Sequence, residues 1–208
     1  MDIVDGIFVA AIIIFSVIIH EVMHGVAADR LGDPTARLSG RLTLNPLPHI
    51  DIVGSIIFPL LTVIANTGFF FGWAKPVPYN PYNFQRMRVW GEAFVAAAGP
   101  LSNLALAFVF GLLIRLDVLP ELHSLFLTVV AINCSLTLLN LMPIPPLDGS
   151  KILASVLPRP LRDAYDVMRA NIEHNPFLGF GLIIVLIYVF SRPFGIAVYG
   201  LSRLIAGI

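Results

Sequence analysis

Long apolar runs alternate with polar, turn-rich stretches along this chain of 208 residues. Residues 3–28 form the first run, which is long enough to cross about 30 Å of hydrocarbon as a helix. Residues 92–116 and 122–148 form two further runs, and the last of these ends in a cluster of prolines. The C-terminal residues 177–208 are apolar again, are interrupted by a polar Arg-Pro pair, and predict one or two more helices. The pattern predicts an all-α protein that crosses the membrane several times.

Composition supports this class. The chain is 57% hydrophobic and 12% charged, whereas typical soluble domains are about 25% charged. Thirteen basic side chains balance thirteen acidic ones without a basic block, so we expect no nucleic-acid partner. The single cysteine, Cys134, excludes an internal disulfide. Because the first residues, MDIVDG, are acidic, we expect a retained span with its N-terminus outside the cytosol, not a signal peptide.

The segment between the first two spans, residues 38–80, is too interrupted for one regular helix. Its apolar part, 52–66, is short and contains Pro59. Residues 40–45 alternate between polar and apolar and could form a strand, and the glycines, prolines and aromatics at 67–80 suit extended or hairpin backbone. We expect a re-entrant or β-hairpin segment, whose backbone must be covered by protein because lipid cannot satisfy its hydrogen bonds.

The distribution of basic residues favours the same topology. If residues 52–78 return to the side that they left, ten basic residues lie on one side of the membrane and three on the other. If residues 52–71 cross completely, the division is six against seven. Real topologies have a strong cytosolic excess of lysine and arginine, so we predict the re-entrant arrangement. The residues on its cytosolic side are Arg30, Arg37, Arg41, Lys75, Arg86, Arg88, Lys151, Arg159, Arg162 and Arg169, and those on the other side are Arg115, Arg192 and Arg203.

A candidate metal site lies at the inner end of the first run, where His20, Glu21 and His24 form H-E-x-x-H. On a helix the two histidines are one turn apart and can bind one zinc ion, with Glu21 beside them as a general base. The alternative is two buried histidines and a glutamate in ordinary helix packing. Ionisable groups are costly inside a membrane span, so the functional reading is favoured.

A catalytic zinc needs a third protein ligand. His49 and Asp51 are nearest in sequence, but Asp148 in NLMPIPPLDG is the better candidate, because three prolines break the helix just before it. Asp148 could also be the N-cap of a helix that begins near Ser150. In the re-entrant topology the first and third spans both run inward, so Asp148 and the histidines reach the same depth.

Three motifs together resemble the site-2 protease family of intramembrane zinc metallopeptidases, peptidase family M50. They are H-E-x-x-H, G-P-x-x-N and N-x-x-P-x-P-P-L-D-G, and the resemblance covers about residues 15–155. Other stretches resemble the short branch of the family that has no PDZ or CBS domain. The resemblance implies one membrane-embedded protease domain, 1–208, with one Zn²⁺ on His20, His24 and Asp148 and with Glu21 as the base.

The resemblance also implies cleavage of a peptide bond in or near a transmembrane segment of a substrate. Asn140 and Asn103 are expected near the substrate, although both could instead form hydrogen bonds between helices. In longer relatives a segment like GWAKPVP is thought to engage substrate, which implies Gly72, Trp73, Lys75 and Pro76. The expected setting is the bilayer of a prokaryotic cell, with the site toward the cytosolic leaflet. An inactive scaffold or chaperone of the same fold is the alternative, and the intact glutamate argues against it.

Overall fold

The computed structural model describes residues 3–57, 74–87 and 90–208. The chain divides into two compact units, Met1–Met87 and Arg88–Ile208. The described residues are mainly helical and contain no β-strand, and three of the helices are long and apolar enough to cross a membrane. The all-α polytopic class is thus confirmed, whereas the assignment of one domain to the whole chain stays a prediction.

Helix α1 (Ile3–Leu31) forms the core of the first unit and contains the H-E-x-x-H sequence. Its 29 residues extend about 43 Å at 1.5 Å per residue, which exceeds the thickness of the hydrocarbon. The first half carries exposed Ile7, Phe8 and Ile14, as expected for side chains that face lipid. Gly32, with φ of 108°, ends the helix in a conformation that side chains other than glycine rarely adopt.

The rest of the first unit consists of short turns. Residues 40–45, which could have formed a strand by their alternation, form turns and bends, and the described part of the 38–80 segment has no strand. Residues 58–73 lie outside the described residues, so the re-entrant passage stays a prediction. The short elements are α2 (Thr35–Leu38), η1 (Leu47–His49), the π-helical turn η2 (Ile52–Ile57) and η3 (Pro81–Asn83).

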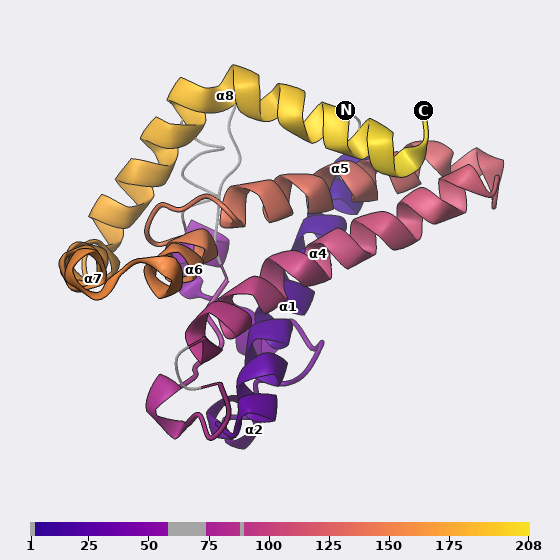
Figure 1. Cartoon of the computed structure of the whole chain (residues 1–208). Helices are drawn as coiled ribbons and strands as arrows, with labels where there is room; N and C mark the ends of the chain where they lie inside the picture. The colour runs from indigo at the N-terminus through magenta and orange to yellow at the C-terminus, as the bar shows by residue number, and fades with distance from the viewer. Residues whose placement is uncertain (1–2, 58–73, 88–89) are drawn as a thin grey trace. The chain divides into compact units, whose positions relative to one another are not determined.

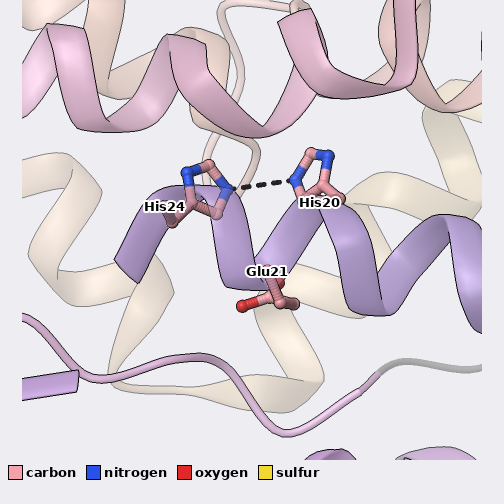
Figure 2. A group of neighbouring side chains, drawn as sticks. All are labelled: His20, Glu21 and His24. Atoms are coloured by element: carbon pink, nitrogen blue, oxygen red, sulfur yellow. Dashed lines mark hydrogen bonds between the residues drawn. The ribbon is translucent and has the colours of Figure 1, made fainter. Parts of the chain in front are cut away.

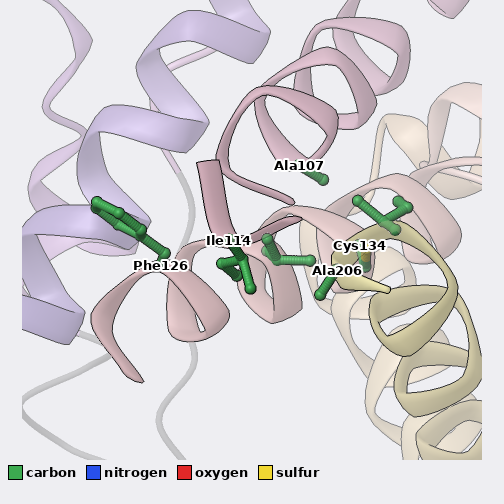
Figure 3. Close-up of a cluster of buried hydrophobic side chains, with 7 residues drawn as sticks. Ala107, Ile114, Phe126, Cys134 and Ala206 are labelled. Atoms are coloured by element: carbon green, nitrogen blue, oxygen red, sulfur yellow. The ribbon is translucent and has the colours of Figure 1, made fainter. Parts of the chain in front are cut away.

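In the second unit, α4 (Gly91–Arg115) and α5 (His123–Asn140) lie side by side (Figure 1). The short 3-10 turn η4 (Pro120–Leu122) precedes α5. The Asn103 amide donates to Asn133 Oδ1 across the helix pair at 2.9 Å. A hydrophobic cluster from α4, α5 and the C-terminal helix fills the adjoining core (Figure 3). Its buried members are Ala107, Ile114, Phe126, Val130, Cys134, Ile205 and Ala206.

The proline cluster interrupts the helical structure as predicted. Helix α5 ends at Asn140, and α6 (Asp148–Val156) begins immediately after the prolines. The amphipathic helix α7 (Arg159–Glu173) follows, with Arg169 paired to Glu92 of α4 at 3.1 Å.

The apolar C-terminus is one bent helix, α8 (Pro176–Ala206). It bends by 60° between Leu186 and Tyr188, as Figure 1 shows. Pro193 lies farther along the helix and cannot bond to the carbonyl of Val189, four residues earlier, which is within one turn of the bend.

Candidate metal centre

The side chains of His20 and His24 face each other on one side of α1 (Figure 2). Their Nε2 atoms are 3.1 Å apart, and the rings meet edge to face with centroids 4.7 Å apart. Both residues are buried, at 6% and 7% exposed. Two nitrogens that bind one tetrahedral zinc at 2.0–2.1 Å lie about 3.3 Å apart. The pair is therefore already close to the spacing that a shared ion requires.

Glu21 completes a cluster of three possible ligands. One ligand atom each from His20, Glu21 and His24 lies within 4.8 Å of the other two. In Figure 2 the glutamate extends from a different side of the helix than the two rings. Its Oε2 accepts a hydrogen bond from the backbone N–H of Val77 at 2.9 Å. Two imidazoles and one carboxylate form a donor set that suits zinc, and one carboxylate oxygen has a fixed backbone donor.

Asp148 is the first residue of α6 and is 7% exposed. The helix begins at Asp148 with Leu147 at the N-cap position, one residue earlier than the alternative of an N-cap at Asp148 requires. Its Oδ1 lies 4.0 Å from the Lys151 ammonium. Asp148 belongs to the second compact unit and the histidines belong to the first. That they share one ion stays a prediction, which rests on the topology.

His49 and Asp51, the nearest candidates in sequence for the third ligand, bind local backbone instead. His49 is buried, with Nε2 2.9 Å from the carbonyl oxygen of Thr43. The Asp51 carboxylate accepts the amide of Gly54 at 2.7 Å at the start of η2. Over the described ranges, neither residue joins the cluster of possible ligands on α1.

The predicted substrate-binding residues differ in their surroundings. Asn103 is fully buried and bonds to Asn133, which supports the alternative that it links two helices. The Asn140 amide donates to Leu136 O, one turn earlier, at 3.0 Å. The carbonyls of Lys75 and Pro76 both accept hydrogen bonds within the first unit. The remaining two, Gly72 and Trp73, lie outside the described residues.

The sequence reasoning missed Asp33, which is fully buried at the end of α1. Its carboxylate accepts hydrogen bonds from Thr35, Asn80 and Asn83. Burial raises the pKa of this carboxyl, but these hydrogen bonds outweigh burial and hold the pKa below its ordinary value. A signal existed in the sequence, because an aspartate between glycine and proline is typical of a turn that the side chain closes.

Arg41 was also missed, and no local signal marks it. It donates to the carbonyls of Lys75 and Pro76, which lie 34 and 35 residues later in the chain. Such a pairing depends on the tertiary fold alone.

Comparison with known proteins adds independent evidence. A family model described as "Peptidase family M50" matches residues 117–186, which include the proline break and Asp148. "Putative zinc metalloprotease YwhC" of Bacillus subtilis is 36% identical over 193 residues, which cover 88% of this chain and 80% of the relative. "Putative zinc metalloprotease Rip2" of Mycolicibacterium smegmatis is 33% identical over 150 residues, or 69% of this chain. No solved structure matches the chain.

The two relatives differ in how much of them this chain covers. It spans 56% of the length of the mycobacterial protein. The Bacillus protein, in contrast, is similar over most of both sequences. Three helices that can cross a membrane also indicate an integral membrane protein. The extent of the similarity to YwhC shows that this chain belongs to peptidase family M50.

Proposed function

We propose that this protein is a zinc metalloendopeptidase that hydrolyses peptide bonds in or near the transmembrane segments of membrane-protein substrates. The observation that carries the proposal is the 3.1 Å separation of two buried imidazole nitrogens at the end of an apolar, membrane-spanning helix. Burial of two imidazoles in a membrane-spanning helix costs free energy, so a functional role such as metal binding is expected for them. The names of the relatives, zinc metalloproteases, support the same chemistry.

In this proposal His20, His24 and Asp148 hold one zinc ion per chain. When bound, zinc supplies a Lewis acid that polarises a carbonyl and lowers the pKa of water toward 7. Glu21 accepts a proton from the attacking water and delivers it to the leaving amine. The Val77 amide orients one oxygen of Glu21, so the other oxygen is available for this proton.

The proposed substrate is a transmembrane helix that enters from the bilayer and unwinds locally, because an intact helix keeps its carbonyls in hydrogen bonds. The extended stretch would bind along residues 69–78 or 143–147 by strand addition. In the described part of the first stretch, Arg41 already binds the carbonyls of Lys75 and Pro76, so addition there must use other groups. The excess of basic residues favours a site toward the cytosolic leaflet of a prokaryotic cell membrane.

The test of function replaces Glu21 with glutamine, which keeps the size of the side chain and an oxygen acceptor for Val77. Purified wild type and Glu21→Gln protein are incubated with a membrane-protein substrate, and bound zinc is measured in both. We expect the variant to keep zinc and to lose cleavage by at least about 10²-fold. Equal cleavage by both proteins would refute the proteolytic role of Glu21, and no cleavage by either on any substrate would favour the inactive scaffold.

The test of the ligand set replaces Asp148 with asparagine. The amide cannot supply a charged oxygen, so zinc affinity should fall markedly. Asp163→Asn is the matched control, because it removes the same charge from an exposed site on α7. Full zinc occupancy in Asp148→Asn at low free zinc would remove Asp148 from the set of ligands.

A further inference from the structure

The segment that bears the amide donor to Glu21 is anchored to the end of α1 by one buried carboxylate. Asp33 Oδ2 accepts the backbone N–H of Asn80 at 2.6 Å, and Oδ1 accepts the side-chain amide of Asn83 at 2.8 Å. Oδ1 also accepts from the Thr35 hydroxyl at 2.5 Å. One side chain thus joins the turn after α1 to residues that lie 47 and 50 positions later. We refer to residues 75–83 as the anchored segment.

A second set of contacts fixes the start of the anchored segment. The Arg41 guanidinium, which is buried, donates to Lys75 O at 2.7 Å and to Pro76 O at 3.3 Å. The N–H of Lys75 donates to His49 O at 2.9 Å. The backbone on the N-terminal side of Val77 is therefore held through both its donors and its acceptors.

Close packing against α1 fixes the centre of the anchored segment. A Cβ on Gly25 would lie 2.8 Å from Val77 Cγ1 and 2.6 Å from the Leu42 side chain, so only glycine fits at this position without a shift. The Val77 side chain is 5% exposed. Gly25 directly follows His24, and Val77 approaches the helix at the same level as the metal-binding sequence. This contact brings the Val77 amide within reach of Glu21.

These contacts have a consequence for the chemistry of Glu21. A glutamate carboxylate that is free to rotate about its side-chain bonds spends little time in any single orientation. A backbone amide that is itself held in place restricts one oxygen and leaves the second to face the reaction. Errors of about 1 Å in the position of a catalytic group can cost roughly 10²-fold in rate.

We propose that Asp33 is a positioning residue for Glu21, which acts by holding the anchored segment so that the Val77 amide orients the carboxylate. The proposal rests on the proposed function for its catalytic part. The alternative is that Asp33 only stabilises the turn after α1, in which case its loss affects stability and leaves the orientation of Glu21 unchanged.

The first experiment measures hydrogen exchange in the zinc-free protein and does not depend on activity. Prolines have no amide hydrogen, so residues 76–80 report the amides of Val77, Tyr79 and Asn80 alone. Exchange is resolved at the Val77 amide itself, because Asn80 binds Asp33 directly and would exchange faster in either case. Asp33→Asn should accelerate exchange at Val77, because the amide group of asparagine offers one acceptor oxygen where the carboxylate offers two. Glu21→Ala should also accelerate it, whereas Glu21→Gln should retain protection.

Asp29→Asn is the matched control for this experiment. It removes the same charge near the C-terminal end of α1, four residues before Asp33. The Asp29 carboxylate is partly exposed and pairs with Arg37. Exchange at the Val77 amide that is equal in Asp33→Asn and wild type would overturn the proposal. If Asp33→Asn does not fold, Asn83→Ala, which removes one of the contacts to Asp33, takes its place and should accelerate exchange less.

The second experiment is kinetic and tests whether Asp33 acts through Val77. Val77→Pro removes the donor N–H, and Val77→Ala keeps the N–H while it reduces packing. We expect kcat to fall roughly 10- to 100-fold in Asp33→Asn and in Val77→Pro, with KM changed less than about threefold and zinc retained. In Val77→Ala the loss of kcat should be smaller than in Val77→Pro.

The double variant decides between positioning and a structural role. If Asp33 acts through the Val77 amide, Asp33→Asn adds little further loss of kcat in the Val77→Pro background. Full additivity of the two losses would overturn the proposal. Absence of zinc-dependent cleavage by the wild type would instead count against the proposed function, and hydrogen exchange would still decide whether Asp33 holds Val77 against Glu21.

Discussion

Gly149, directly after the proposed ligand Asp148, occupies a crowded position in the second unit. A Cβ there would lie 2.3 Å from the carbonyl oxygen of Leu141 and 2.4 Å from that of Met142. Ordinary contacts between carbon and oxygen atoms are about 3.3 Å or longer. Both obstacles are backbone atoms, so rotation of a side chain cannot relieve the overlap. Gly149→Ala must therefore move α6 away from the proline break by about 1 Å, the difference between these distances and an ordinary contact.

The magnitude follows from this displacement. Overpacking of this kind typically costs about 1–3 kcal/mol of stability. A shift of about 1 Å in Asp148 relative to the rest of its unit should also lower kcat by roughly 10²-fold. The assay combines thermal unfolding in detergent, zinc content after dialysis at controlled free zinc, and the rate of substrate cleavage. We expect loss of zinc affinity together with loss of activity.

Gly200→Ala is the matched control. It lies in α8, and its added Cβ would meet nothing within 4 Å. Alanine is the better helix former, so stability should be unchanged or higher by up to about 1 kcal/mol. If Gly149→Ala matched Gly200→Ala in stability, zinc content and rate, the close approach of the two carbonyls to Gly149 would be wrong.

Three further predictions follow from other parts of the structure. The pKa of Asp33 lies below its ordinary value of about 3.9, so the Asp33 carboxylate contributes its full stability above about pH 3.9 and loses this contribution as the pH falls further. In thermal unfolding, the difference in stability between wild type and Asp33→Asn should therefore shrink below about pH 3.9. Arg169→Met should cost about 1–2 kcal/mol in thermal unfolding, because Arg169 is 14% exposed and pairs with Glu92; no loss would mean that the pair is inconsequential. Cysteines at exposed positions 80 and 160 should be labelled from the same side of the membrane, whereas labelling from opposite sides would exclude the re-entrant topology.

The sequence predicted the helices well because each is defined by many residues. The span predicted at 92–116 is observed at Gly91–Arg115, and the break before Asp148 follows from three prolines that cannot continue a helix. The suggested strand at 40–45 was wrong. Its alternation of apolar and polar residues is short, and no partner strand lies among the described residues to pair with it. Short patterns carry little information where tertiary contacts decide the backbone.

The candidate site was predictable to the extent that its residues are adjacent in sequence. His20 and His24 are one helical turn apart, and helix geometry alone brings their nitrogens together. The contact between Glu21 and Val77 spans 56 residues and could not be read from local pattern. The same holds for Arg41, whose partners are backbone carbonyls and leave no mark on residue type.

The arrangement of the first unit explains why a hydrolytic site can lie at the end of an apolar helix. The first half of the helix carries exposed apolar side chains such as Ile7 and Phe8, which suit contact with lipid. From His20 onward it also has polar neighbours: the Val77 amide binds Glu21, and Asp33 and Arg41 bind the backbone of the segment that carries this amide. Backbone that lipid could not satisfy is thus satisfied by buried side chains of the same unit. The polar groups that bind the non-helical backbone of this unit are the same groups that fix the proposed base, so stability of the fold and orientation of Glu21 depend on one set of contacts.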